Sequence, residues 1–165
     1  MICKVRPEDF DALLNVINDA AQAYRGVIPN DRWKEPYMSR EELRKEIGRG
    51  VEFYGYFASD ALVGVMGIQH VKDVTLIRHA YVLTHHQKIG IGQNLLKHLL
   101  SLARTTEIMA GTWENASWAV RFYQKHDFKL VSIKEKRRLL RKYWDIPERQ
   151  IETSVVLRFK KQDLS

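Results

Sequence analysis

The spacing of apolar residues alternates between the short period of strands and the longer period of helices. Residues 2–6 alternate apolar and polar, as a strand does, and Pro7 then begins a stretch whose apolar residues recur at helical spacing. Proline in the first turn of a helix forfeits no hydrogen bond. Ser39, with Glu42 three positions later, has the spacing of a capping box and predicts the start of a second helix. The chain therefore opens with a strand and two helices.

The middle of the chain predicts three strands in succession. Residues 51–58 and 62–69 are strand-like and are separated by Ser59 and Asp60, which suit a hairpin turn; residues 74–83 form the third run. The remaining pattern predicts helices over 90–104, 117–126 and 135–143, and strands over 107–113, 128–133 and 152–159. The order βααβββαβαβαβ is typical of an α/β fold, with a mixed sheet covered by helices on its faces.

Length and composition limit the class of protein. With 165 residues, the chain is expected to form one domain over 1–165. No apolar run approaches the roughly 18 residues of a membrane span, and the first residues lack a signal pattern, so we expect a cytoplasmic protein without a membrane partner. Cys3 is the single cysteine, which excludes an intrachain disulfide and a cysteine-based zinc cluster. His85 and His86 are adjacent and should point apart on an extended chain, so no metal is expected.

The charge balance is basic. There are 27 Lys and Arg against 20 Asp and Glu, for a net charge of +7. Such a charge suits a partner that carries phosphates, whether a nucleic acid or an anionic cofactor, and does not choose between them.

Residues 79–96 carry the most informative motif. A strand runs into a glycine-containing turn, and the turn opens a helix whose first amides have no partner within the helix. Gly90 and Gly92 would let a phosphate approach these amides closely, and Lys88 adds a cation. Leu95 stands where the dinucleotide motif G-x-G-x-x-G needs glycine, and the Walker A pattern is absent. The glycine pair alone would also fit a simple tight turn.

Two segments together resemble a known family. The pattern Gln87-x-x-Gly90-x-Gly92, between a Tyr-Val strand and a Leu-rich helix, resembles the acetyl-CoA pyrophosphate loop of the GNAT N-acetyltransferases. Residues 119–128 resemble the A-[IV]-x-F-Y-x-x-x-G-F segment of the same superfamily, about forty positions downstream. The element order agrees as well. The resemblance covers residues 2–133 and 152–159.

This resemblance implies a GNAT-like mixed, mostly antiparallel central sheet, with an extra basic helix before the last strand. It implies acetyl-CoA as the co-substrate, without a metal. The residues that it places on the cofactor are Val82, whose backbone would pair with the pantetheine arm, and Gln87, Lys88, Ile89, Gly90, Ile91, Gly92 and Gln93, whose amides would hold the pyrophosphate.

Three positions depart from the family pattern. Thr84 stands where proline is common, Asp127 replaces the glycine that ends a helix, and Ala116 stands where asparagine is frequent. Aspartate tolerates the left-handed conformation better than most residues. Asn115 or Ser117 could supply the missing cap or cofactor contact, and we assign Asn115 to the cofactor site.

The implied reaction is a direct attack of a neutral amine on the thioester of acetyl-CoA. Tyr123 matches the family tyrosine that protonates the departing thiolate, and its alternative role is to fill space in the core. His79 is a possible general base and alternates onto one strand face with Tyr81. Other candidates for the base are Glu52, His70 and Glu114, and a water relay would need none of them.

The acceptor side is expected in the connection between the first two helices, residues 24–38. Tyr24, Trp33 and Tyr37 would contact a small amine that carries apolar or carboxylate groups. The same aromatic residues could instead attach the loop to the core, although loops of this length are uncommon without a function.

The segment 134–144 holds six basic residues and one acidic residue. A solvated helix face is the simplest interpretation. The alternatives are an electrostatic funnel for CoA, a homodimer contact through the apolar face, and contact with nucleic acid. The sequence as a whole predicts an N-acetyltransferase for a primary amine of a small molecule. An acyl-CoA-binding regulatory module and a basic nucleic-acid-binding domain are the alternatives, and the second lacks a recognition motif.

Overall fold

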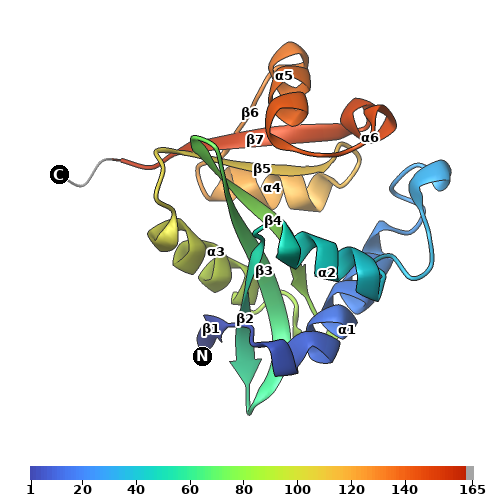
Figure 1. The fold of residues 1–165 in the computed structure, drawn as a ribbon, viewed down its shortest axis with the longest axis vertical. Helices are drawn as coiled ribbons and strands as arrows, with labels where there is room; N and C mark the ends of the chain where they lie inside the picture. Colours follow the sequence, from blue (N-terminus) through green and yellow to red (C-terminus); the bar gives the residue numbers. More distant parts are fainter. Residues whose placement is uncertain (163–165) are drawn as a thin grey trace.

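The computed structural model describes residues 1–162, which form one seven-stranded sheet and its covering helices (Figure 1). The strand order is β1-β2-β3-β4-β5-β7-β6, and every pair is antiparallel except β4 with β5. The strands are β1 (Ile2–Lys4), β2 (Glu52–Ala58), β3 (Ala61–Val71), β4 (Val74–Val82), β5 (Glu107–Trp113), β6 (Lys129–Leu130) and β7 (Ser154–Lys160). The expected mixed, mostly antiparallel α/β architecture is confirmed.

Six α-helices lie within the described residues. They are α1 (Phe10–Ala21), α2 (Arg40–Gly48), α3 (Ile91–Leu102), α4 (Ser117–Lys125), α5 (Ile133–Tyr143) and α6 (Glu148–Glu152). The capping signal before α2 is confirmed, because the Ser39 hydroxyl accepts a hydrogen bond from the Glu42 amide at 3.1 Å. None of these helices combines the length and the hydropathy needed to cross a membrane.

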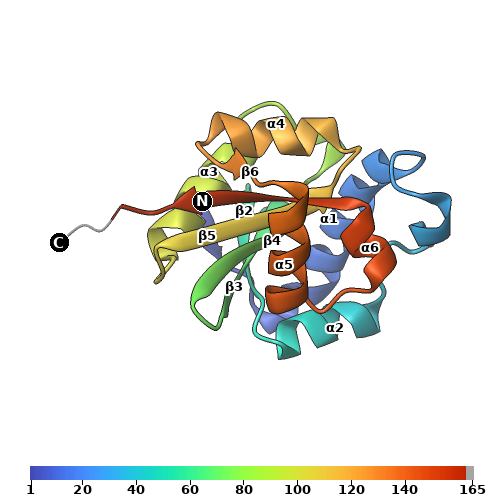
Figure 2. The ribbon, with the colours of Figure 1, turned by 90° about the horizontal axis from the view of Figure 1, so that it is seen from above.

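The helices form a layer on each face of the sheet. Seen from above, α3 and α4 lie on one side of the strands, and α1, α2, α5 and α6 lie on the other (Figure 2). Successive side chains of β5 point to opposite faces of the sheet and so contribute to both layers. Ile108 and Ala110 belong to the core beneath α3 and α4, whereas Met109 belongs to the core beneath α5. The sheet is therefore buried on both faces near its centre.

The sheet opens between β4 and β5. These parallel strands pair only where Thr75–Ile77 lies beside Ile108–Ala110, and beyond that point β4 continues with β3, and β5 with β7. A bulge in β4 accompanies the separation: Arg78 pairs with Gly67 and Tyr81 with Val65, so β4 has one extra residue. A bulge bends its strand and increases the local twist. The two strand ends thus diverge and leave a gap within the sheet.

Two expectations near the C-terminal end were wrong. The strand expected over 128–133 shrinks to two residues, because the hydroxyl of Ser132 accepts from the Glu135 amide and caps α5 at that point. Helix α6 was not expected, and it adds a second helix before the last strand. The local signal for the cap, Ser132 followed by Glu135, was present in the sequence.

The apolar face of the basic helix is not free. Leu139, Leu140 and Tyr143 of α5 are buried against the sheet, so a homodimer contact through this face is excluded. Helix α5 also lies on the opposite face of the sheet from α3 and its N-terminal loop (Figure 2). This position does not support a role for α5 as a funnel for CoA.

Candidate active site

A cleft of about 800 Å³ occupies the gap between β4 and β5. On the α3 and α4 side it is lined by the glycine loop and by Phe122 and Tyr123 of α4. On the other side it is lined by Tyr24 and Tyr37 and by residues that follow α5. The cleft therefore joins both faces of the sheet, so that two reactants could meet between the strands.

The glycine loop presents a run of free backbone amides. Gly90 is the N-cap of α3 with φ +88°, and Lys88 has φ +67°. The amide of Asn94 donates to the Gly90 carbonyl, whereas the amides of residues 87–93 have no acceptor within residues 1–162. Unpaired amides at a helix N-terminus favour a polyanion such as a diphosphate. The geometry expected of a phosphate loop is thus present.

Two contacts hold this loop against the sheet. A Cβ at Gly64 of β3 would lie 2.7 Å from Ile91 Cγ2, so only glycine lets the first turn of α3 sit so close to the strand. The Gln87 side chain donates from Nε2 to the Val82 carbonyl at 3.0 Å. The Gln87 side chain therefore supports the loop from within, and it occupies the carbonyl of Val82.

The departure at Thr84 also has a structural role. Both its amide and its hydroxyl donate to Asp19 Oδ2 of α1, at 3.0 and 3.1 Å. These bonds tie the end of β4 to α1 at a position where proline could offer neither donor.

The structure divides the residues assigned to the cofactor. Those that line the cleft are Val82, Gln87, Lys88, Gly90, Ile91, Gly92 and Gln93. Ile89 and Asn115 do not line it; Ile89 is 70% exposed, and Asn115 lies in an exposed turn. The N-cap of α4 is the buried Ala116, and no side chain caps this helix. Neither Asn115 nor Ser117 replaces the family asparagine as a cap.

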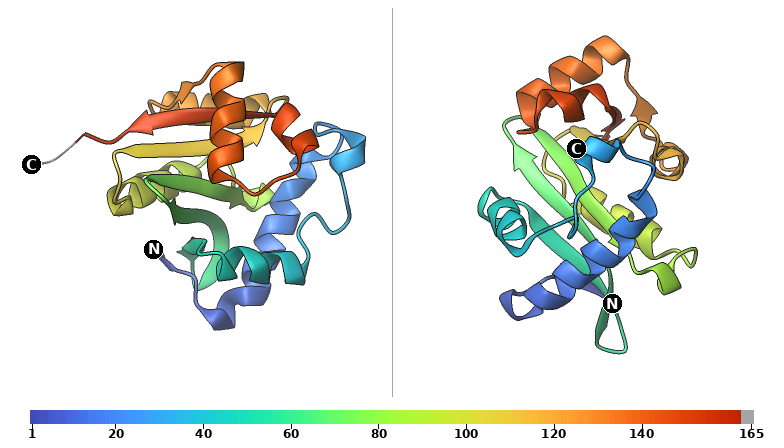
Figure 3. Two further views of the ribbon diagram at one scale, coloured as in Figure 1. Left: turned by 45° about the horizontal axis from the view of Figure 1, so that its top comes forward. Right: turned by 90° about the vertical axis from the view of Figure 1, so that its right-hand side faces the viewer.

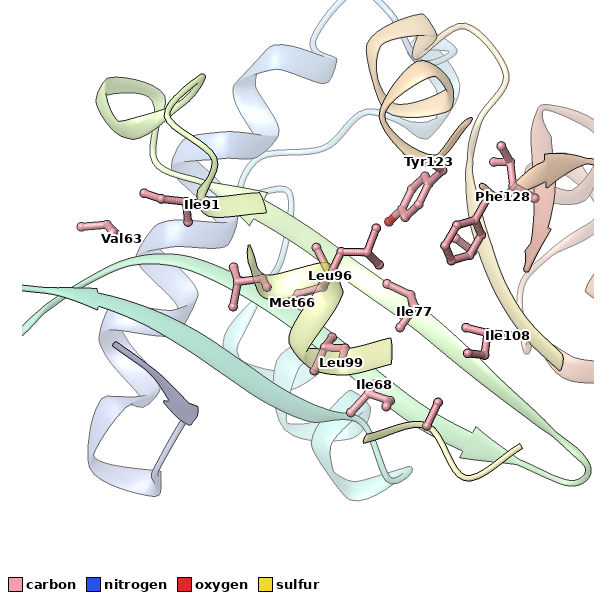
Figure 4. Close-up of a cluster of buried hydrophobic side chains, with 14 residues drawn as sticks. Val63, Met66, Ile68, Ile77, Ile91, Leu96, Leu99, Ile108, Tyr123 and Phe128 are labelled. Carbon is pink, nitrogen blue, oxygen red and sulfur yellow. The ribbon is translucent and has the colours of Figure 1, made fainter. Parts of the chain in front are cut away.

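Tyr123 lies at the inner end of the cleft. It is 5% exposed and packs against Phe122 and Phe128, with ring centroids 5.2 and 5.3 Å away. Figure 4 shows its hydroxyl turned away from Phe128, toward the side of Leu96. Burial raises the pKa of Tyr123 well above its ordinary value, and the nearby Tyr24 raises it further. The residue is thus part of the core and also a neutral proton donor that faces the cleft.

Three further tyrosines gather on the opposite side of the gap. The Tyr24 ring stacks on Tyr37 at 6.3 Å and meets the edge of Tyr81 at 6.4 Å. Burial raises the pKa of Tyr24 to about 12 and that of Tyr81 well above its ordinary value. Tyr24 and Tyr81 therefore stay neutral near pH 7 and offer hydroxyls without adding charge.

Trp33 differs from its two neighbours. Tyr24 and Tyr37 line the cleft, whereas Trp33 lies behind Tyr37 with its ring centroid 5.7 Å away. It belongs to a small core with Ile28 and Trp113. Trp33 therefore attaches the loop to the core, as the alternative interpretation held, and does not contact the cleft.

His79 has an acidic partner that sequence reasoning missed. Its Nε2 lies 3.4 Å from Glu46 Oε2 of α2, and Arg78 Nη1 lies 2.9 Å from the same oxygen. Burial lowers the pKa of His79, although Glu46 opposes this shift. Burial alone would raise the pKa of Glu46, but His79 and Arg78 together lower it. The pair is thus a neutral imidazole beside a carboxylate. Glu46 follows the buried Leu43 by one helical turn, and this spacing could have indicated that it faces inward.

The other base candidates lie away from the cleft. Glu52 pairs with Lys4 at 3.3 Å, His70 Nε2 accepts from the Arg104 amide at 3.2 Å, and neither these residues nor Glu114 lines the cleft. His86 does line it. Among residues 1–162, no three His, Cys, Asp or Glu residues are grouped as metal ligands.

A second wall of the cleft was also missed. Trp144, Ile146 and Gln150, from the segment between α5 and α6 and from α6 itself, line the acceptor side. The Trp144 ring lies over Gly111 of β5, where a Cβ would contact its Cζ2 at 3.4 Å. No motif marks this segment, because only the tertiary fold brings it to the gap.

Comparison with known proteins agrees with this geometry. Residues 16–141 match the family model described as an acetyltransferase (GNAT) domain. The chain belongs to the GNAT acetyltransferase family. It is therefore an acyltransferase, and acetyl-CoA is its co-substrate. A search of curated proteins finds no significant match.

Solved structures of GNAT proteins share the fold. The PaiA N-acetyltransferase of Thermoplasma acidophilum, in complex with coenzyme A, is 21% identical over 98% of each chain, with a TM-score of 0.75. The ribosomal-protein-S18-alanine N-acetyltransferase of Escherichia coli is 13% identical, with a TM-score of 0.71, and 100% of this chain aligns with 96% of that one. The N-acetylglutamate synthase of Neisseria gonorrhoeae, complexed with coenzyme A and N-acetyl-glutamate, is 18% identical, with a TM-score of 0.68; the match covers 99% of this chain and 35% of that one. These names include a protein acceptor as well as a small molecule, so the GNAT family alone does not decide the acceptor.

Proposed function

We propose that this GNAT enzyme transfers the acetyl group of acetyl-CoA to the primary amine of a small molecule by direct attack. The observation that carries the proposal is the wall that Trp144, Ile146 and Gln150 form on the acceptor side of the cleft. Arg149 of α6 bonds Asp31 of the α1–α2 connection at 3.0 Å, and Arg49 after α2 lies 3.2 Å from Asp145. The segment 144–150 is thereby anchored to the α1–α2 connection and to the end of α2. In Figure 3, helix α6 lies beside the blue loop of that connection. A protein acceptor would need a more open approach to the gap.

The free amides of the cleft-lining residues 87, 88 and 90–93 are the proposed site for the diphosphate of acetyl-CoA, and Lys88 adds a positive charge beside them. Acetyl-CoA supplies an acetyl group that is activated as a thioester. Val82 and Gly92 line the path from this loop to the gap between β4 and β5.

Tyr123 is proposed as the general acid. When the bond from the acceptor nitrogen to the acetyl carbon forms and the carbon–sulfur bond breaks, Tyr123 would donate its phenolic proton to the sulfur. Burial raises the pKa of Tyr123. The same burial destabilises a thiolate in the cleft, so the pKa of the leaving thiol rises together with that of the phenol.

His79 is proposed as the base, with Glu46 as its positioning residue. The Glu46 carboxylate facing Nε2 favours the tautomer with its proton on that nitrogen, which leaves Nδ1 as the proton acceptor. The lowered pKa of His79 keeps the imidazole neutral near pH 7, as a base requires.

The test is an acetyl-CoA-dependent thiol-release assay with amino acids, monoamines, polyamines, aminoglycosides and peptides. We expect turnover with small amines. Turnover confined to peptides or proteins would overturn the proposed acceptor class. Binding of acetyl-CoA without turnover of any acceptor would favour the regulatory-module alternative, and salt-dependent binding of DNA without affinity for acetyl-CoA would favour the nucleic-acid alternative.

A further inference from the structure

The acceptor side of the cleft has an unusual composition for a site that receives amines. The uncharged side chains that line this side of the cleft form what we call the acceptor wall. They are aromatic, aliphatic or neutral and polar: Tyr24, Tyr37, Tyr81, Thr112, Trp113, Trp144, Ile146 and Gln150. Among the described residues, those that line the cleft include no Asp or Glu, while Arg78, Lys88 and Lys125 are cations. Arg78 is paired with Glu46, and Lys88 and Lys125 belong to the glycine loop and to α4, so the acceptor wall itself is aromatic and carries no charged side chain.

We infer that the acceptor is a monoamine with an aromatic or bulky apolar body and without a second positive charge. This inference rests on the proposed function and narrows its acceptor class.

The aromatic part of the argument rests on the rings around Tyr24. Its ring lies 6.3 Å from Tyr37, 6.4 Å from Tyr81 and 5.3 Å from Trp118, so it is the centre of an aromatic cluster drawn from the α1–α2 connection, β4 and α4. Trp144 adds a further ring from the segment after α5. Flat apolar groups pack favourably on such faces, and one ammonium can also approach them through its attraction to the π-electrons.

The second part of the argument is that no carboxylate among the described residues lines the cleft, and that three acids around it are paired with arginines. Asp31 is bonded by Arg149, Asp145 pairs with Arg49, and Glu46 pairs with Arg78. None of the three acids lines the cleft. A second ammonium on the acceptor would therefore lose its water without gaining a free carboxylate.

The experiment compares three acceptors with the wild-type protein: 2-phenylethylamine, n-butylamine and spermidine. We expect kcat/KM for 2-phenylethylamine to exceed that for each of the other two by at least about tenfold, since a well-filled apolar pocket discriminates by roughly 10- to 200-fold. Preference for spermidine, or equal rates with all three amines, would overturn the inference.

A charge variant tests the cause. Gln150→Glu places a carboxylate on the acceptor wall, and the matched control Gln162→Glu adds the same charge at an exposed residue outside the cleft. The first variant should shift the ratio of spermidine to 2-phenylethylamine turnover at least several-fold toward spermidine, and the second should leave it unchanged. An unchanged ratio in both, with normal coenzyme A binding, would contradict the charge argument. If Gln150→Glu does not fold, the wild-type comparison decides.

The same data separate this inference from the proposed function. Turnover of polyamines or hydrophilic amino acids alone would overturn the inference and leave the proposed small-molecule acetyltransferase standing. Turnover of peptides alone would overturn both. Coenzyme A binding without turnover of any arylalkyl monoamine would count against the inference.

Discussion

Tyr123→Phe is the substitution that tests the proposed chemistry most directly. It removes one oxygen from a side chain that is 5% exposed, and the hydroxyl has no hydrogen-bond partner among residues 1–162. No buried group loses a partner, so the free energy of unfolding should change by less than about 1 kcal/mol. Loss of a general acid should lower kcat by about 10²- to 10⁴-fold, equivalent to roughly 3–5 kcal/mol in the activation barrier.

The assay combines thiol release with calorimetric binding of coenzyme A and thermal unfolding. The variant should bind coenzyme A and unfold normally while kcat falls. Tyr143→Phe is the matched control: its hydroxyl donates to Asp73 at 2.7 Å, so its loss should lower stability by about 1 kcal/mol and leave kcat unchanged. Unchanged kcat in Tyr123→Phe would refute the acid role. A joint loss of turnover, cofactor binding and stability would show instead that Tyr123 acts only by packing.

Three further predictions concern the loop, the base and the support beneath α3. Gly90→Ala should lower the free energy of unfolding by about 1–2 kcal/mol and raise the KM for acetyl-CoA. Gly50 has φ +101° and does not line the cleft, so the control Gly50→Ala should lose similar stability with an unchanged KM. Equal effects of the two variants on KM would contradict the role of the glycine loop in binding acetyl-CoA. Burial holds the pKa of His79 in the folded protein below 6.5. The free energy of unfolding should therefore increase with pH between the pKa of His79 in the folded protein and 6.5, its value in the unfolded chain. The acid limb of the pH profile of kcat/KM should also lie below pH 6.5. Glu46→Gln removes the group that raises this pKa, so the limb should move to lower pH; an unmoved limb in the pH–rate profile would exclude His79 as the base. Gly64→Ala should destabilise the protein by about 1–3 kcal/mol, because its methyl group would displace the first turn of α3. Calorimetry should then show weaker binding of coenzyme A. Wild-type affinity for coenzyme A would show that the loop tolerates the displacement.

Local signals in the sequence were sufficient for most of the helices and strands and for the glycine turn before α3. Ser39 caps α2 as its spacing indicated, and Ser59 and Asp60 both adopt the positive φ of a two-residue hairpin turn, at +49° and +67°. Gly90 likewise adopts positive φ before α3. These features depend on steric and hydrogen-bonding preferences within a few neighbouring residues, so the sequence could determine them.

The cleft itself was decided by the tertiary structure. Its gap exists because β4 bulges and leaves β5, and its walls come from segments that no local pattern connects. Glu46 reaches His79 from another element, and Arg149 bonds Asp31 across 118 positions of the chain. Trp33 could have lined the cleft or packed behind it, and only the packing of the whole loop chose the second. Contacts between distant segments depend on how helices and strands pack together, and periodicity within one segment carries no information about the partner it meets.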